Sequence, residues 1–135
     1  MSKIAGEVSF SLDMRALDGA VLEATERRVA GLAAEIGVRR GVAFELGAFI
    51  RAAPGPCSPR VRAELLAAAA ALGVPAMEIG SGASHDAQAF AVAGVETAML
   101  FIRNAHGSHN PKESMELADF ADAARVLARW LALHL

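Results

Sequence analysis

Three short polar stretches hold the side chains of this sequence that could do chemistry. They are Ser11–Arg15, Ser81–Asp86 and Gly107–Glu113. Imidazole changes its charge near neutral pH and is the commonest metal ligand, so the main candidates are the two histidines of the second and third stretches, His85 and His109. Arg15 ends a predicted strand, where an arginine is usually a solvated charge at the rim of a sheet.

His85 follows a turn of small residues, Gly82–Ser84, and begins a predicted helix. The backbone N–H groups at the start of a helix attract anions, so His85 would lie beside donors suited to a negatively charged ligand. The alternative is that Ser84 caps the helix and the His85 side chain faces water. The residues themselves leave both interpretations open.

His109 lies in a predicted loop between Gly107 and Pro111. Proline disfavours helical backbone at the residue before it, so this loop should be stiff enough to hold one imidazole at a metal ion. The alternatives are an incidental histidine in a turn, or a pair formed by His106 and His109. The pair alone does not complete a zinc site, because zinc requires at least three protein ligands.

Other residues with metal-binding chemistry have simpler interpretations. Glu113 and Glu116 could ligate a metal, but we interpret them as charges at the start of the last helix. Cys57 is the only cysteine, which excludes an intrachain disulfide and favours a reduced, cytoplasmic setting. A lone cysteine is most often a small buried apolar residue, and we expect this of Cys57.

The first half of the chain has the pattern of a β-α-β unit. Apolar and polar residues alternate over residues 7–15 and 41–50, which predicts two strands with one buried face each. Between them, apolar residues at helical spacing predict a helix from about Leu17 to Ile36. Asp18 is a suitable N-cap for this helix, and Gly37 is a suitable left-handed C-cap.

The second half alternates helices and strands. Residues 51–59 contain three prolines and predict a linker. The rest has the order α-β-α-β-loop-α, which is typical of an α/β layer. We therefore expect an α/β protein, with a β-α-β unit at residues 1–52 and an α-β-α-β-α part of a mixed-sheet layer at 57–135. The predicted helices run from a Ser58 cap to Gly73, from about residue 86 to Gly94 and onward from an Asp119 cap, and the predicted strands cover 75–79 and 97–103.

Composition narrows the class of protein. The 135 residues are 54% hydrophobic and 21% charged, which suits one globular domain that buries roughly 68% of its unfolded surface. The formal net charge of −2 is made of scattered charges, so nucleic acid is not an expected partner. No apolar run reaches the roughly 18 residues that span a membrane, and the N-terminal residues lack the pattern of a signal peptide.

Together, the three polar stretches resemble the hydantoinase/carbamoylase group of the M20-type metal-dependent amidohydrolases. Residues 6–15 resemble the strand of the family's lid domain that ends in Asp-x-Arg. Residues 80–87 resemble its Ser-Gly-Ala-Gly-His-Asp-Ala turn, and residues 101–113 resemble its Ser-His-Asn-Pro-x-Glu loop. The group includes N-carbamoyl-L-amino-acid hydrolases, allantoate amidohydrolases and β-ureidopropionases. The resemblance covers nearly the whole chain.

This resemblance implies an enzyme with a catalytic domain that binds two divalent metal ions (zinc, manganese, nickel or cobalt) and a smaller, ferredoxin-like lid that also dimerises. His109 would ligate the second metal ion, and Arg15 would grip the carboxylate of a small-molecule substrate with two hydrogen bonds. His85 would act at the reacting carbonyl as a catalytic and substrate-binding residue, and Ser84 and Gly82 would help to bind the substrate. Metal-activated water would attack a linear carbamoyl or amide C–N bond.

Several parts of the family's site have no counterpart in this sequence. It contains no His-x-Asp pair and no Glu-Glu pair, and Ser84 stands where the family's turn has glycine. The resemblance therefore implies the C-terminal part of such an enzyme, with residues 1–52 as the second half of the lid and 57–135 as the end of the catalytic domain. Alone, the chain is expected to hold no metal stably and to be inactive, and to require an N-terminal catalytic half or a second copy.

Two other interpretations stay open. The chain could be a non-catalytic binding or oligomerisation module that retains the fold, since an exposed strand edge and helix face can pair with a second copy. It could also be an unrelated small α/β protein in which the motifs arise by chance.

Overall fold

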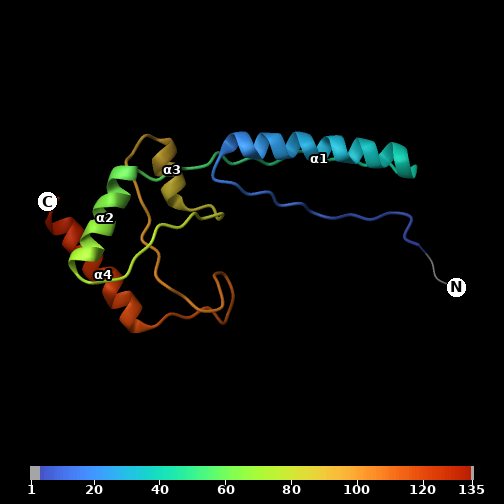
Figure 1. The fold of residues 1–135 in the computed structure, drawn as a ribbon. Coiled ribbons are helices and arrows are strands. Elements are labelled where there is room, and N and C mark those ends of the chain that lie inside the picture. Colours follow the sequence, from blue (N-terminus) through green and yellow to red (C-terminus); the bar gives the residue numbers. More distant parts are fainter. Residues whose placement is uncertain (1–3, 135) are drawn as a thin grey trace. The chain divides into compact units, whose positions relative to one another are not determined.

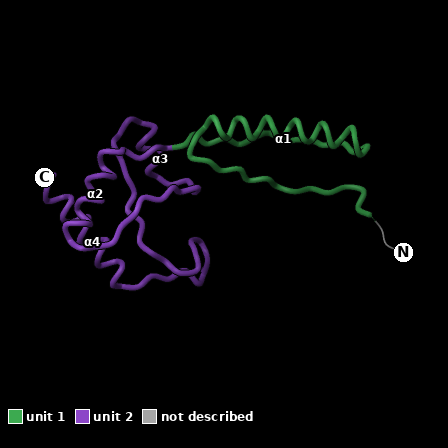
Figure 2. The backbone as a smooth tube through the Cα atoms, in the orientation of Figure 1, with its two compact units in different colours: residues 1–54 green, residues 55–135 purple. Residues whose placement is uncertain are grey.

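The computed structural model describes residues 4–134, which form four helices (Figure 1). The chain divides into two compact units, one ending at Pro54 and the other beginning at Gly55 (Figure 2). This division lies inside the proline-rich segment 51–59. The helices are α1 (Gly19–Arg40), α2 (Pro59–Ala71), α3 (Asp86–Val92) and α4 (Leu117–Ala132). Within residues 4–134, no helix combines the length and apolar character needed to cross a bilayer.

Two helices begin where their capping residues predict. The Asp18 carboxylate accepts a hydrogen bond from the Ala20 N–H at 2.8 Å and caps α1. The Ser58 hydroxyl accepts from the Val61 N–H at 3.4 Å, and Pro59 occupies the first turn of α2. Both predictions are confirmed, because the groups that satisfy the free N–H donors of a helix start lie within three residues of it.

Two other predicted helix ends are wrong. The first helix does not stop at Gly37 but continues to Arg40, and the left-handed residue that ends it is Gly41, at φ 66°. The Gly37 carbonyl accepts from the N–H groups of both Gly41 and Val42 and closes the last turn there. Asp119 does not cap α4, which begins two residues earlier. It lies in the first turn instead, and its carboxylate pairs with Arg103.

The four predicted strands are not observed as a sheet. Residues 7–15, 41–50, 75–79 and 97–103 have no regular secondary structure, and the only β-type pairing within residues 4–134 is an isolated antiparallel bridge between Ala105 and Ser114. Alternation along a strand shows which face is apolar, but the ladder forms only with a neighbouring strand about 4.8 Å away. The mixed-sheet arrangement therefore stays a prediction.

The expected extent of burial is wrong. The chain exposes 10,875 Å², whereas a compact monomer of its mass would expose about 6,700 Å² and two separate compact domains about 8,000 Å². Only about 46% of the unfolded surface is buried, not roughly 68%. Apolar side chains contribute to this excess, because residues such as Ile50 (100% exposed) and Met77 (79%) lie in the segments without strand partners.

The second unit has a small core between α2 and α4. Ala68 and Ala69 of α2 and Val126 of α4 are almost completely buried. The small alanine side chains let the two helices approach closely. Partly buried Leu65, Leu72, Val74 and Trp130 surround this core.

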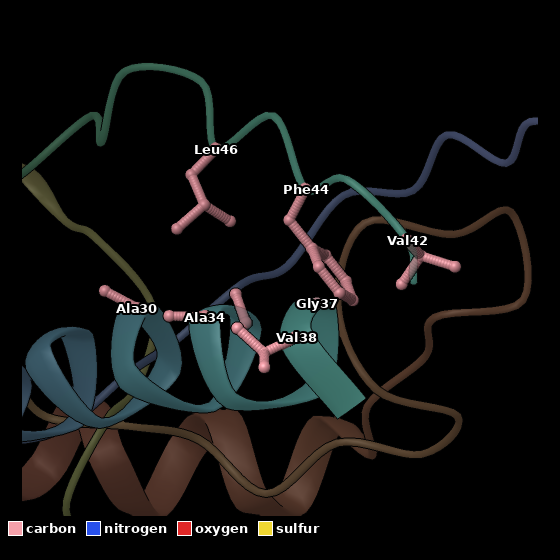
Figure 3. A pocket seen from close by; sticks show the side chains of 8 residues that line it. Ala30, Ala34, Gly37, Val38, Val42, Phe44 and Leu46 are labelled. Atoms are coloured by element: carbon pink, nitrogen blue, oxygen red, sulfur yellow. The ribbon is translucent and has the colours of Figure 1, made fainter. Parts of the chain in front are cut away.

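The first unit contains an apolar groove rather than a closed core. It lies along α1 against the segment that follows the helix, has a volume of about 410 Å³ and is lined by apolar groups (Figure 3). Only Ala33 among the described residues of this unit is buried. The groove is lined by Ala30, Ala33, Ala34, Gly37, Val38, Val42, Phe44 and Leu46.

Gly55 marks a close approach between the linker and α3. A Cβ atom added at Gly55 would lie 2.6 Å from the Gln88 Cα and 2.8 Å from its Cγ. We expect Gly55→Ala to lower the free energy of unfolding by about 1–3 kcal/mol, because the backbone of α3 must move away. Denaturant unfolding measures this change. Gly6→Ala is the matched control, since nothing lies within 4 Å of that position; equal effects of the two substitutions would contradict the prediction.

Glu64 of α2 accepts a hydrogen bond from the C-terminal end of α4. Its Oε2 accepts a hydrogen bond from Trp130 Nε1 at 3.0 Å, and its Oε1 accepts from Arg60 Nη1 at 2.7 Å. The His134 ring stacks on Trp130, with its Nδ1 2.7 Å from the Trp130 carbonyl and its Nε2 3.2 Å from Glu64 Oε2. A carbonyl can only accept, so Nδ1 donates to it, and the Nε2 contact becomes a hydrogen bond only when the ring also carries its second proton.

The Glu64 contacts predict a pH-dependent contribution to stability. The hydrogen bond from Trp130, assisted by Arg60, lowers the pKa of Glu64 below its ordinary value of 4.5. A lowered pKa in the folded state stabilises the fold above pH 4.5, and this contribution is lost as the pH falls through the folded value. We expect the wild type to melt at a higher temperature than Glu64→Gln at pH 7, and the difference to vanish at strongly acidic pH. Glu7→Gln, at an exposed carboxylate, controls for net charge. A difference that persists in acid would contradict the assignment.

Candidate active site

His109 lies in a closed loop that precedes α4. The two arms of the loop meet at Ala105 and Ser114. The Ala105 N–H donates to the Ser114 carbonyl at 2.8 Å, and the Ser114 N–H donates to the Ala105 carbonyl at 3.4 Å. These two bonds form the antiparallel bridge. The bridge fixes both ends of the eight-residue connection, residues 106–113, that carries the histidine, which limits the positions that His109 can reach.

The backbone at His109 is held in an uncommon conformation. His109 and His106 have φ values of 65° and 66°, and they are the only residues other than glycine with positive φ within the described part of the chain. Left-handed backbone is unfavourable for a residue with a Cβ by roughly 1–2 kcal/mol. Such conformations persist only where surrounding contacts impose them, and they concentrate at functional sites.

Glu113 supplies one of those contacts. Its Oε2 accepts from the His109 N–H at 3.1 Å, and its Oε1 accepts from Asn104 Nδ2 at 3.0 Å. The bond from Asn104, followed by that from the His109 backbone, lowers the pKa of Glu113. The interpretation of Glu113 as a helix-start charge is therefore wrong. Glu116 does stand at the start of α4, as its N-cap residue, although its side chain makes no capping bond.

Asn110 supplies further internal contacts of the loop. Its Nδ2 donates to the carbonyls of His106 (2.8 Å) and Gly107 (3.0 Å), and its Oδ1 accepts from the Lys112 N–H at 2.9 Å. These bonds across the turn add to the restriction that Pro111 places on the backbone. The expectation of a stiff loop is supported by side-chain contacts that the sequence pattern did not specify.

Beside this loop, Arg103 links its first arm to α4. Arg103 Nε and Nη2 donate to the two carboxylate oxygens of Asp119 at 3.0 and 2.6 Å. Both residues, together with the two arms of the loop, border a small hollow of about 190 Å³. The loop is thus anchored to a helix as well as closed on itself.

His85 occupies the first position before α3. It is the N-cap residue, with extended backbone and no side-chain capping bond, so the alternative in which Ser84 caps the helix is wrong. Its ring is half-buried, with Nε2 2.9 Å from Ser81 Oγ and its edge against Phe101 at 5.6 Å between ring centres. The Ser81 hydroxyl in turn accepts from the Ala83 N–H.

The structure therefore adds two neighbours that orient the His85 ring. Ser81 and Phe101 were not among the predicted site residues, although a serine four residues before a histidine within a turn could have suggested the first. Gly82 and Ser84 lie in the same turn and are exposed. Within residues 4–134, no hydrogen bond or ring contact joins His85 to His109.

Arg15 belongs to the first unit and pairs with Asp13. Its Nε and Nη2 donate to the same carboxylate oxygen, Oδ2, at 2.9 and 2.5 Å. This contact lowers the pKa of Asp13 and raises that of Arg15. The Arg15 side chain is 58% exposed. The pairing fixes its orientation while leaving much of its surface accessible to a ligand.

The described residues do not by themselves fit a metal pair. Within residues 4–134, no group of three or more histidine, cysteine, aspartate or glutamate side chains is placed to hold a metal ion. The carboxylate nearest to His109 in the loop, Glu113, uses both of its oxygens in hydrogen bonds. Cys57 is a free, half-buried thiol, so it is less buried than expected.

The chain matches one protein family over almost its full length. The sequence profile of Peptidase family M20/M25/M40 matches residues 5–133. An N-carbamoyl-L-amino-acid amidohydrolase of Paenarthrobacter aurescens is 29% identical over 95% of this chain. Allantoate amidohydrolases of Escherichia coli (strain K12) and Bacillus subtilis (strain 168) are 30% and 33% identical over 95% and 92% of it.

These similarities cover only part of each relative. The chain spans about a third of the length of the curated relatives that it matches, 30% to 31% for the three named here. No solved structure gives a significant match.

Proposed function

Because the chain belongs to Peptidase family M20/M25/M40, we propose that it contributes part of the active site of a metal-dependent amidohydrolase. The family has an α/β fold, and the predicted β-α-β and α-β-α-β-α units are our assignment of this chain to its lid and catalytic domains. The reaction would be hydrolysis of a linear carbamoyl or amide C–N bond. This reaction class is supported by relatives named for N-carbamoyl-L-amino acids and for allantoate.

The substrate would be a small carboxylate. Compounds of the N-carbamoyl amino acid, ureidopropionate and allantoate types all present a carboxylate next to the bond to be cleaved. Arg15 would bind that carboxylate with two parallel hydrogen bonds, a geometry that lysine cannot reproduce. Its fixed pairing with Asp13 supports this role, because a guanidinium held in one orientation loses less freedom when it binds.

His85 would contact the substrate near the reacting carbonyl. The ring is half-buried and oriented by Ser81 and Phe101, so it can present a defined nitrogen to a ligand. The exposed turn of Gly82 and Ser84 would add contacts to the substrate. A histidine held from two sides suits catalysis better than one that faces water, because its geometry is set before the substrate arrives.

His109 would ligate one of two divalent metal ions in a site completed by residues outside this chain. The observation that carries the proposal is the closed loop of a member of this family, in which Glu113 and Asn110 hold His109 in left-handed backbone. Zinc, manganese, nickel and cobalt all accept imidazole, so the loop does not discriminate among them. We propose that this chain alone holds no metal pair.

The other ligands would come from a partner that covers the apolar surface. The chain exposes about 2,800 Å² more than two compact domains of its size would, and a stable interface buries about 1,200–2,000 Å². The groove along α1 (Figure 3) is one such uncovered surface. The partner would be an N-terminal catalytic segment of the same family or a second copy. With its free Cys57, the chain suits a reducing, cytoplasmic compartment.

The proposal is tested by reconstitution. The purified chain is assayed for metal content and for hydrolysis of an N-carbamoyl amino acid, alone and mixed with the N-terminal two thirds of the Escherichia coli relative. We expect no turnover and no stoichiometric metal from the chain alone, and metal-dependent turnover from the mixture. Turnover by the chain alone would contradict the composite site, and an inactive mixture in which the two parts form a stable complex would contradict the catalytic role.

A second candidate function is a non-catalytic oligomerisation module. The exposed apolar groups of the first unit favour it, since they could be covered by another copy. Sedimentation distinguishes the two: self-association without activity in any mixture supports the module, and a strict monomer at high concentration excludes it.

A further inference from the structure

We infer that Glu113 is the positioning residue for His109: by accepting one hydrogen bond from each side of the loop, its carboxylate fixes the direction in which the imidazole leaves the backbone. The inference rests on the proposed role of His109 as a ligand. It concerns a residue four positions further along the chain that itself contacts no substrate or metal ion in the proposal.

Both oxygens of the Glu113 carboxylate accept hydrogen bonds. Oε1 receives Asn104 Nδ2 at 3.0 Å, from the arm that precedes the bridge residue Ala105, and Oε2 receives the His109 N–H at 3.1 Å, at the tip of the loop. Hydrogen bonds to a charged acceptor are stronger than bonds between neutral groups. Glu113 therefore joins the beginning of the loop to its tip.

The tip of the loop has an uncommon backbone conformation. His109 has φ 65°, which is unfavourable for a residue with a Cβ. Among residues 4–134, the His109 N–H makes no hydrogen bond other than that to Glu113, so without this bond φ would relax toward negative values. A change to about −65° rotates the side chain by about 130° relative to the preceding peptide, which would carry the imidazole away from its present direction.

Glu113 does not cap α4. The helix begins four residues later, at Leu117, and Glu116 occupies its N-cap position. Glu116 provides a matched control, because it is an exposed carboxylate three residues away that makes no capping bond. Replacing either glutamate with glutamine removes one negative charge and keeps the shape of the side chain.

The test compares Glu113→Gln with Glu116→Gln in the full chain by NMR. Left-handed backbone brings a residue's own N–H and Hα close together, so wild-type His109 should show a strong cross-peak between them. A glutamine amide offers one acceptor oxygen for two donors. We expect Glu113→Gln to weaken this cross-peak and shift the His109 amide signal, and Glu116→Gln to leave both unchanged. Unchanged His109 signals in a folded Glu113→Gln chain would overturn the inference.

Two further variants keep the test decisive. Asn104→Ala removes the other bond to Glu113, together with the 3.4 Å bond from Asn104 Nδ2 to Ser108 Oγ. It should shift the His109 signals in the same direction but less, even if Glu113→Gln fails to fold. Unchanged signals in this variant would count against the inference. Glu113→Asp should not rescue the wild-type signals, because a side chain one methylene shorter cannot reach both donors. Full rescue by aspartate would contradict the bridging geometry.

The outcome is independent of the proposed function. The NMR measurement needs no metal and no substrate, so it tests positioning alone. In the reconstituted mixture, Glu113→Gln should lower kcat by roughly 100-fold, with KM little changed, since a misplacement of about 1 Å can have this effect. If Glu113→Gln displaces His109 but His109→Ala leaves hydrolysis unchanged, the positioning role stands and the proposed ligand role fails.

Discussion

His109→Ala is expected to lower metal-dependent hydrolysis by the reconstituted enzyme by at least about 1000-fold. Loss of one ligand from a catalytic metal pair removes several kcal/mol of stabilisation from the transition state, and each 1.4 kcal/mol is about tenfold in rate. The substitution leaves the loop closed, because the bridge between Ala105 and Ser114 and the Asn110 contacts do not involve the imidazole. Initial rates across a series of metal concentrations measure the effect.

His106→Ala is the matched control for this experiment. His106 lies in the same loop with nearly the same left-handed backbone, at φ 66°, but the proposed site gives it no role. We expect its replacement to change the rate by less than about threefold, a range typical of exposed substitutions. If the two variants behave alike, or if the His109→Ala rate equals the wild-type rate at limiting as well as at saturating metal, His109 is not a ligand.

Arg15→Lys is expected to raise KM for the carboxylate substrate by about 10-fold to 100-fold, with a smaller change in kcat. Lysine keeps the positive charge but offers a single point of contact, so the paired hydrogen bonds are lost. A loss of ground-state and transition-state binding together appears in KM rather than in kcat. A substrate analogue without the carboxylate should be hydrolysed equally slowly by wild type and variant, which separates carboxylate binding from a general loss of activity.

Arg51→Lys is the corresponding control in the same unit. Arg51 donates through Nε and Nη2 to the two carboxylate oxygens of Glu26, so it is also paired with a carboxylate through two donors, and its side chain has a similar exposure to that of Arg15. No substrate contact is proposed for it, and KM should stay at the wild-type value. A KM increase with both variants would indicate a structural effect on the first unit instead of carboxylate binding by Arg15.

Local chemistry accounts for the features that were predicted from the sequence. The starts of α1 and α2 follow from Asp18, Ser58 and Pro59, because a cap bonds to backbone groups two or three residues away. The family membership follows from short motifs whose order along the chain is visible without a fold. The end of α1 escaped this reasoning, because Gly37 and Gly41 are both suitable C-caps and only the course of the chain through Val42 selects the second.

In the candidate site, too, some features could be predicted from the sequence and others could not. Its histidines and its arginine are recognisable in the sequence by their types and by the motifs around them. Their neighbours are not, because Phe101 reaches His85 from sixteen residues away and Asn104 reaches Glu113 across the whole loop. Such contacts depend on where the chain turns back on itself, which no local pattern encodes.

By itself, the sequence determined which side chains carry chemistry, where capped helices begin and which family the chain belongs to. Only the tertiary structure decided that Glu113 accepts hydrogen bonds within the loop and does not cap the helix, and that His109 adopts left-handed backbone. It also decided that many apolar side chains of the predicted strands remain exposed. The physical reason is the range of the interactions. Caps and turns are satisfied within a few residues, whereas strand pairing and loop closure require a partner distant along the chain or on another polypeptide.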